Sequence, residues 1–215
     1  LLQSASVIGK DFPFVLLQAI ADASPDELHQ SLRRLQAAEF FYEVRLLPEL
    51  EYTFRHALTH VVAYDSLLPE RRRVLHGQVL YELERLDSNR MTERVETLGD
   101  HALRGELWEK AVSYLRLAAH KAHDRWALGQ AIVHTQQAIG ALERRPACRA
   151  RDTDAIELRL ELFQYYYLRG SVAQSAAILQ EAERFAETSG TTEQLAYIAL
   201  CKGENFRLAG DFVQA

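Results

Sequence analysis

The spacing of apolar side chains predicts helices along most of the chain. Residues 1–8 have the pattern of the last turns of a helix, which Gly9 ends. An apolar helix is expected over residues 12–23. The next helix starts after Ser24, because serine, proline and glutamate occupy the cap, the first and the third helical positions of a capping box. The apolar side of this helix is expected to hold Leu28, Leu32, Leu35 and Phe40.

Two short runs of alternating residues interrupt the helices. Over residues 41–46, Tyr42, Val44 and Leu46 alternate with charged side chains. Over residues 51–55, aromatic side chains again alternate with polar ones, and the intervening residues 47–50 contain a proline and are typical of a turn. This pattern predicts a β-hairpin. The order helix, helix, hairpin is that of a winged-helix domain.

Helices are expected again from His56 to the end of the chain. The first apolar stripe consists of Leu58, Val61, Val62, Tyr64 and Leu68. Pro69 starts the following helix, whose buried side is expected to consist of Val74, Leu75, Val79, Leu83 and Leu86. Two later stripes consist of Leu107, Ala111, Leu115, Ala118 and Ala122, and of Ala131, Thr135, Ala138 and Leu142.

Three segments in the second half of the chain share a pattern. RGELWEKAVSYLRLA begins at residue 104, RGSVAQSAAILQEA at 169 and AGDFVQA at 209. In each, a glycine closes one helix and an alanine follows five or six residues later. Gly170 and Gly210 are 40 residues apart, close to the length of a tetratricopeptide-like helix pair, whereas Gly105 and Gly170 are 65 apart, which indicates one longer or irregular pair.

These patterns predict a mainly α-helical protein with two domains. Residues 1–68 would form a winged-helix domain with one small β-hairpin. Residues 69–215 would form a tetratricopeptide-like right-handed α-superhelix, with a linker bundle as the alternative for its first helices.

Composition and charge agree with a helical globular protein and argue against nucleic-acid binding. Hydrophobic residues make up 48% and charged residues 26% of the 215 residues, and glycine and proline are scarce. The net charge of −5 gives no basic excess. The basic run Arg71 to Arg73 lies next to Glu70 and is typical of a solvated helix face. If the winged helix bound DNA, the helix from Ser24 to Glu39 would present His29, Arg33 and Arg34, a weak footprint opposed by nearby acids.

The remaining chemistry points to a protein without an active site of its own. Gly9-Lys10 is not a Walker A loop, because Ser4 and Asp11 stand where a glycine and a hydroxyl residue are needed, and no Walker B strand is found. His56 and His60 are spaced like zinc ligands, but Ala57 replaces the glutamate of that motif and no third ligand is evident. We therefore expect no catalytic residues and no metal site.

Cysteine usage and hydropathy favour the cytoplasm. Cys148 and Cys201 match no zinc or redox motif, which suggests two free thiols in a reducing compartment. No window is apolar enough to span a membrane, and Leu1 begins no signal peptide. Both ends have the pattern of a segment of a longer polypeptide. In the run Tyr165 to Tyr167, at least one tyrosine is expected to face a groove or the next repeat.

His56 is the candidate binding residue. It stands where the second predicted strand meets a helix, so its imidazole N–H can lie beside the free backbone N–H groups of the helix start. This combination suits a phosphate oxygen. A capping or core histidine is the alternative.

The first 86 residues resemble a known family. The segments LLQSASVIGKDFPFVLLQAI, SPDELHQSLRRLQAAEFFYE and EYTFRHALTHVVAYDSLLPERRRVLH are similar to the region after the ATPase core of STAND proteins, the signal-transduction ATPases with numerous domains. They are most similar to a bacterial group in which an adenylate or guanylate cyclase domain precedes the ATPase module and tetratricopeptide-like repeats follow it.

The resemblance implies a nucleotide switch. In this family the winged helix folds back over the nucleotide, and a histidine at a strand-to-helix junction contacts the β-phosphate of ADP. His56 matches that histidine, while Arg55 replaces the apolar residue before it and Ala57 the acid after it. The resemblance thus makes His56 and Arg55 the cofactor-binding residues. It implies no cofactor in this segment alone and ADP or ATP in an intact parent.

The expected function is therefore non-catalytic signal coupling. The repeats would bind a protein or a small ligand, and the winged helix would pass that event to an upstream nucleotide-binding domain. Two alternatives remain: a transcription regulator whose winged helix binds DNA and whose repeats act as the sensor, and a plain protein-interaction scaffold without a nucleotide.

Overall fold

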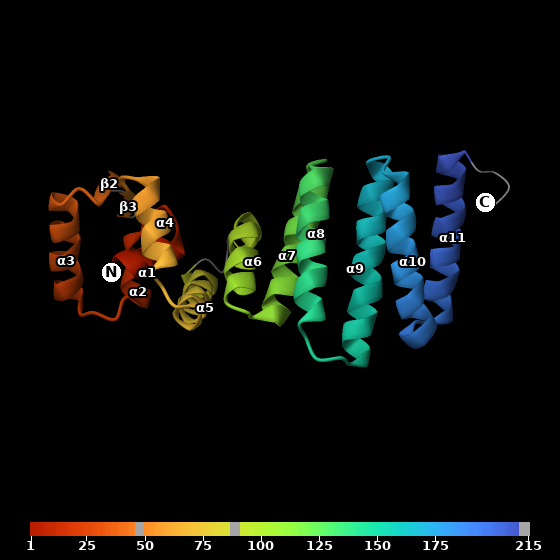
Figure 1. Ribbon diagram of the computed structural model, residues 1–215, viewed down its shortest axis with the longest axis horizontal. Helices are drawn as coiled ribbons and strands as arrows, with labels where there is room; N and C mark the ends of the chain where they lie inside the picture. The colour runs from red at the N-terminus through yellow and green to blue at the C-terminus, as the bar shows by residue number, and fades with distance from the viewer. Residues whose placement is uncertain (46–49, 87–90, 211–215) are drawn as a thin grey trace. The chain divides into compact units, whose positions relative to one another are not determined.

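The computed structural model describes residues 1–45, 50–86 and 91–210, without the side chains of residues 45 and 209. These residues are mainly helical, with eleven α-helices and one three-stranded antiparallel sheet (Figure 1). This confirms the mainly α prediction with a small sheet. Most of the predicted turn at 47–50, and the helix expected after Gly210, lie outside the described residues.

The chain forms two compact units. The first consists of Leu1–Arg94 and His101–Leu107, and the second of Val95–Asp100 and Trp108–Ala215. Helix α6, Val95–Arg104, therefore contributes to both units. The domain boundary at residue 68 stays a prediction.

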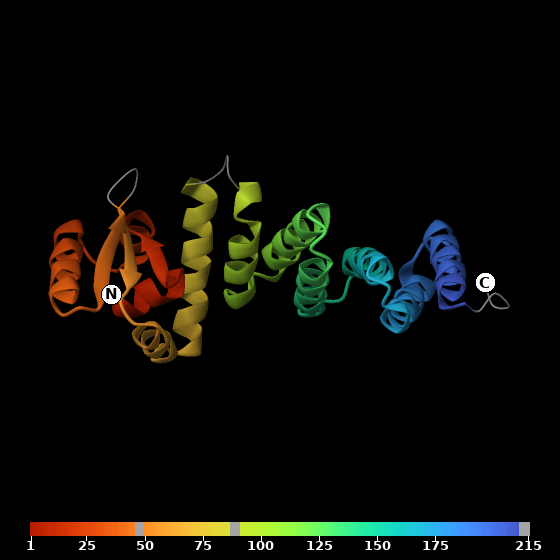
Figure 2. The same cartoon turned by 90° about the horizontal axis from the view of Figure 1, so that it is seen from above.

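The first unit packs helices around the sheet. Its elements are α1 (Leu2–Ile8), β1 (Asp11–Pro13), α2 (Phe14–Ile20), α3 (Pro25–Ala37), β2 (Phe41–Arg45), β3 (Glu51–Phe54), α4 (Ala57–Asp65), α5 (Pro69–Leu86) and the 3-10 turn η1 (Met91–Glu93). Strand β3 lies between β1 and β2 and is antiparallel to both. Figure 2 shows α3 on one side of the strands and α1 and α2 on the other.

The helix predicted over residues 12–23 is wrong at its start, where strand β1 forms instead. Phe12 pairs with Tyr52 of β3, and the Asp11 carboxylate accepts a hydrogen bond from the Thr53 hydroxyl. The ring of Phe12 is fully buried, with its centroid 5.0 Å from that of Phe41. Aromatic packing in the core therefore outweighs the local helical pattern, and the helix begins only at Phe14.

The start of α3 confirms the predicted capping box. The Ser24 hydroxyl accepts from the backbone N–H of Glu27, and the Glu27 carboxylate accepts from the backbone N–H of Ser24 at 2.9 Å. Hydrogen bonds from Ser24 also lower the pKa of Glu27. Leu28 and Leu32 are buried as expected, but the helix ends at Ala37, so Phe40 lies beyond it.

The predicted hairpin is confirmed, but its apolar alternation on β2 faces outward. Phe41 pairs with Phe54, and both side chains are buried. Tyr42 and Val44 are half exposed or more. The side of β2 that reaches the core is therefore set by Phe41, since successive side chains of a strand point to opposite faces.

The apolar stripe predicted for α4 is also mainly on the surface. Leu58 is 72% exposed and Val62 59% exposed, and Val61 and Leu68 are exposed as well. On α5, Leu75, Val79 and Leu83 are buried as predicted, whereas Val74 and Leu86 are exposed. The neighbouring elements α1, α2 and β3 therefore cover only part of the apolar faces of α4 and α5.

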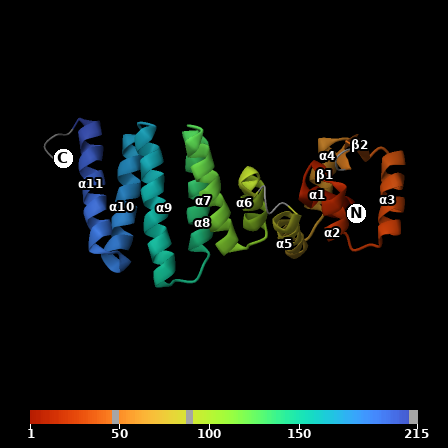
Figure 3. The same cartoon turned by 180° about the vertical axis from the view of Figure 1, so that it is seen from behind.

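Besides the start of α6, the described part of the second unit contains five helices that follow one another side by side (Figures 1 and 3). They are α7 (Trp108–Asp124), α8 (Leu128–Glu143), α9 (Arg149–Leu168), α10 (Val172–Ser189) and α11 (Thr192–Ala209). Alanines fill the contacts: Ala111, Ala118, Ala131, Ala138 and Ala182 are all fully buried. Small side chains let neighbouring helices approach closely, so the predicted alanine stripes are confirmed. Leu107 precedes α7 and is exposed.

A left-handed residue stands at the turns before α7, α8 and α10 and at the end of α11. Glu106, Trp126, Gly170 and Gly210 have φ between 54° and 80°. After the first three of these, a helix begins two residues later, and a fully buried small residue follows five residues later: Ala111, Ala131 and Ser175. Gly105 is itself right-handed, and the turn at Trp126 divides the long interval that glycine spacing alone leaves unexplained.

Candidate functional site

The predicted site residue His56 lies on the surface of the first unit. It is the N-cap of α4, with extended backbone angles, and its side chain makes no capping hydrogen bond. Arg55, His56 and Ala57 are all exposed. The imidazole is therefore free to bind a ligand beside the first N–H groups of α4, which have no partner within the helix. His56 is thus the N-cap residue of α4, but its ring neither makes a capping bond nor is sealed in the core.

Arg55, the second predicted binding residue, contacts the two residues that precede strand β2. Its guanidinium lies 3.0 Å from the Glu39 carboxylate, and its backbone N–H donates to the carbonyl of Phe40. Both charged side chains are largely exposed. A surface ion pair of this kind is weak, so Arg55 can be drawn to a phosphate at small cost.

His60 does not join His56 in a common site. Its Nε2 lies 3.0 Å from the carbonyl oxygen of Ser6, and its ring packs edge-on against Phe54 at 5.1 Å. The described residues contain no cluster of three or more histidine, cysteine or acidic side chains that could hold a metal ion. Cys148 is exposed and Cys201 buried, and both are free thiols.

Two arginines of the basic run Arg71 to Arg73 are engaged in local contacts. Arg72 donates to the carbonyls of Asp65 and Leu67, and Arg73 lies 3.2 Å from Glu106. On α3, the Nδ1 of His29 lies 2.7 Å from the carbonyl of Pro25. Among the described residues, none of the helices combines the length and apolarity needed to cross a membrane.

A buried polar cluster joins α4, α5 and α6 within the first unit. His76 and His101 contact each other through Nδ1, and the Nε2 of His76 lies 3.0 Å from the Tyr64 hydroxyl. Arg72 and Arg104 lie over the Tyr64 ring, with centroid distances of 4.7 and 5.8 Å. Burial, followed by the proximity of His101, Arg104 and Arg72, lowers the pKa of His76 to about 3. His76 is therefore neutral at physiological pH.

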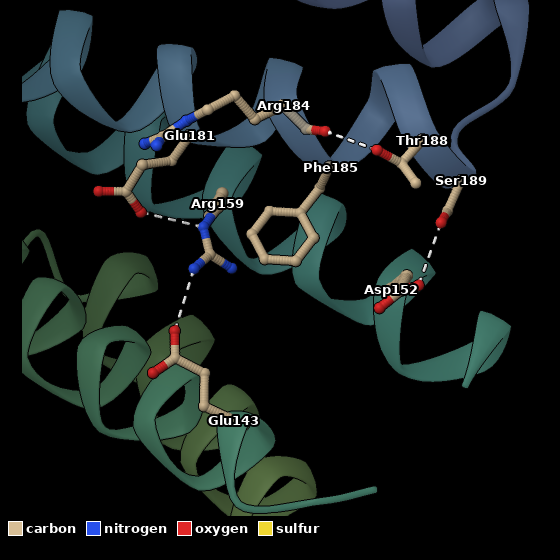
Figure 4. A pocket seen from close by; sticks show the side chains of 8 residues that line it. All are labelled: Glu143, Asp152, Arg159, Glu181, Arg184, Phe185, Thr188 and Ser189. Atoms are coloured by element: carbon tan, nitrogen blue, oxygen red, sulfur yellow. Dashed lines mark hydrogen bonds and ion pairs between the residues drawn. The ribbon is translucent and has the colours of Figure 1, made fainter. Parts of the chain in front are cut away.

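The second unit contains a charged cavity that the sequence analysis missed. It has a volume of about 430 Å³ and is lined by α8, α9 and α10. Figure 4 shows its side chains, with Arg159 at the centre. Arg159 is a cation within the buried face of α9, between Ile156 and Leu162. A charged residue at an apolar position of a helix is the signal that could have revealed it.

Three hydrogen bonds and one aromatic ring hold the Arg159 guanidinium in place. Its Nε donates to Glu181 at 3.1 Å and its second terminal nitrogen donates to Glu143 at 3.2 Å. Its first terminal nitrogen donates to the carbonyl of Ala155, and its guanidinium stacks on Phe185 at 4.4 Å from the ring centroid. The arginine thus connects three helices, in agreement with the rule that a buried charge is paired.

A second hollow adjoins this cavity at the start of α9. The two share Asp152, Thr188 and Ser189, and the second also reaches Cys148 and Arg149. The Ser189 hydroxyl donates to Asp152 at 3.0 Å and the Thr188 hydroxyl to the carbonyl of Arg184. The two hollows therefore adjoin each other along α9 and α10.

The tyrosine run divides between core and surface. Tyr165 is buried, and burial together with Glu161 and Asp124 raises the pKa of its hydroxyl to about 12. Tyr166 accepts a hydrogen bond from Gln136 of α8 at 3.0 Å. Tyr166 and Tyr167 are only partly buried and pack against the core of the second unit, and the expected groove contact stays a prediction.

Comparison with known proteins leaves the family open. No protein-family model and no solved structure matches the chain. An uncharacterized protein of Rhizobium meliloti is 28% identical over 141 residues. The match covers 64% of this chain but only 13% of the length of that protein. The chain is therefore similar to a small part of a much larger protein.

Proposed function

We propose that this chain is a non-catalytic regulatory segment of a STAND-type signalling ATPase. Its first unit would be a winged-helix domain that docks on a nucleotide-binding domain of the same polypeptide. The helices of the second unit would form a tetratricopeptide-like right-handed superhelix that receives a protein or a small ligand. The proposed location is the cytoplasm, and a linked nucleotide cyclase is the proposed output.

The observation that carries the proposal is the position of His56. The ring is exposed at the N-cap of α4, makes no capping bond, and stands beside the N–H groups of the first turn. An imidazole N–H and helix N–H groups together can bind a phosphate oxygen. The exposed apolar face of α4, with Leu58, Val61 and Val62, begins next to this position and offers a surface for a covering domain.

The element order and the partial match support the same reading. Helices α2 and α3 precede the hairpin of β2 and β3, and β1 adds a third strand, as in a winged helix. The similarity to a short part of a much longer Rhizobium meliloti protein agrees with a segment that works inside a multidomain polypeptide.

The test is nucleotide retention in the full-length parent. Loss of a charge-assisted hydrogen bond of about 1.5–3 kcal/mol should raise the ADP dissociation rate by roughly one to two orders of magnitude in His56→Ala. The measurement is displacement of a fluorescent ADP analogue. His29→Ala is the matched control, because it removes another exposed histidine of the same unit. An unchanged ADP dissociation rate in His56→Ala would contradict the proposed function.

A further inference from the structure

The cavity around Arg159 contains N–H donors and carboxylate oxygens that have no hydrogen-bond partner in the described part of the chain. Arg159 has five N–H donors, and three of them have partners in the described part of the chain. The other two N–H groups, one on each terminal nitrogen, have none there. The N–H groups of a buried guanidinium normally all have hydrogen-bond acceptors, because a buried polar group without a partner destabilises the fold.

The acids of the cavity are only half engaged. Glu143 bonds to Arg159 through Oε1 and Glu181 through Oε2. The second oxygen of each carboxylate has no hydrogen-bond partner among the described residues, and the side chains are 61% and 42% exposed. Each can therefore accept a further N–H donor from a ligand in the cavity.

Arg184 supplies a second cation at the same cavity. Its side chain is exposed and forms no ion pair or hydrogen bond among the described residues. Figure 4 shows its guanidinium on the same side of the cavity as Glu181. Two arginines and three acids, the third being Asp152, line the cavity, so neither a simple anion nor a simple cation satisfies it.

We infer that this cavity binds a small zwitterion of the free α-amino acid class. The ligand carboxylate bonds to Arg184 and to the spare N–H groups of Arg159. The ligand ammonium bonds to the free oxygens of Glu143 and Glu181, and its side chain lies along Phe185. The volume of about 430 Å³ suits a ligand of this size. The binding itself does not depend on the proposed function. Only its role as the signal sensed by the helical repeats rests on that proposal.

The test is isothermal titration of the whole chain with the twenty L-amino acids. At least one amino acid should bind. Its decarboxylated amine and its N-acetyl derivative should each have an affinity at least about tenfold lower, because each lacks one of the two charges. Arg184→Ala should weaken the amino acid by about tenfold and leave the decarboxylated amine unaffected. Glu143→Gln should weaken the amino acid and leave the N-acetyl derivative unaffected.

The control is Arg169→Ala, which removes an exposed arginine from the end of α9 outside the cavity. Circular dichroism confirms that each variant is folded. The inference is overturned if no amino acid binds, if the singly charged analogues bind equally well, or if Arg184→Ala binds like the unchanged chain. The titration needs no nucleotide, so its failure would leave the ADP-retention test of the proposed function standing, and the reverse also holds.

Discussion

His76 and His101 share one hydrogen bond between their Nδ1 atoms, 2.9 Å apart in the interior of the first unit. Only one of the two nitrogens can carry the proton of that bond, so the pair is intact when at least one ring is neutral. His76 reaches the Tyr64 hydroxyl through its other nitrogen, and Arg72 and Arg104 lie against Tyr64. A proton added to His76 would therefore place a buried cation near Arg72 and Arg104.

The first prediction is a loss of stability in acid that depends on His76. Its folded pKa of about 3 is below the ordinary value of 6.5, so the unfolded chain binds more protons between these values. The stabilisation is complete above pH 6.5 and is lost as the pH falls toward 3. Each pKa unit corresponds to about 1.4 kcal/mol, so the full loss is on the order of 5 kcal/mol. Urea unfolding at pH 7.5, 6, 5 and 4 measures it.

The variant His76→Gln should have a smaller pH dependence over this range, because the titrating ring is gone while the carboxylates are unchanged. His29→Gln serves as the comparison, since His29 is exposed. If His76→Gln and the unchanged chain lost stability in parallel between pH 6.5 and 4, the buried pair would not be the cause.

The second prediction concerns the left-handed turn at Gly170. Its φ is 77°, and a Cβ added there would meet no atom within 4 Å. Gly170→Ala should therefore destabilise the protein by about 1–2 kcal/mol through backbone strain alone. Gly140→Ala is the matched change, because Gly140 lies inside helix α8 with open space around it. Since alanine favours helix, it should stabilise by about 0.5–1 kcal/mol. Thermal unfolding would show shifts of opposite sign, and shifts of the same sign would refute the argument.

The third prediction concerns the start of α11. The Thr191 hydroxyl accepts from the backbone N–H of Gln194 at 3.2 Å, and the Gln194 side chain accepts from the backbone N–H of Thr191 at 2.9 Å. Thr191→Ala should cost about 1 kcal/mol, because it removes a helix cap. Thr192→Ala removes the same side chain one residue later, where it caps nothing, and should cost much less. Equal losses in urea unfolding would show that the capping box contributes nothing here.

The fourth prediction tests the exposed face of α4. The double change Leu58→Ser and Val62→Ser should alter the free energy of unfolding of this chain by less than about 0.5 kcal/mol, because both side chains already contact water. Leu75→Ala, a buried position on α5, should cost about 2–5 kcal/mol. A large loss in the α4 variant would mean that this face is packed against protein.

Much of the local structure could be predicted from short-range patterns. The capping box at Ser24, the hairpin of β2 and β3 and the alanine stripes of α7 and α8 follow from hydrogen bonds and spacings within a few residues. Strand β1 could not be predicted in this way. Its three residues have a helical neighbourhood in sequence, and only the pairing with β3, forty residues away, makes them a strand.

The candidate sites divide along the same line. The sequence pointed to His56, because a strand-to-helix junction is a local feature, and its exposure agrees with that role. Arg159 drew no attention, since an isolated arginine in a helix is usually solvated. Its importance comes from Glu143 and Glu181, which lie on two other helices.

The sequence by itself determined where helices and strands can begin and end, because caps, alternation and helical periodicity act between neighbouring residues. The tertiary structure alone decided which apolar faces are covered, so that the stripe of α4 faces outward while Phe12 is drawn into the sheet. It also brought Arg159 between two acids and His76 against His101. Burial and charge pairing depend on residues far apart in the chain, and a local pattern carries no information about which of them will meet.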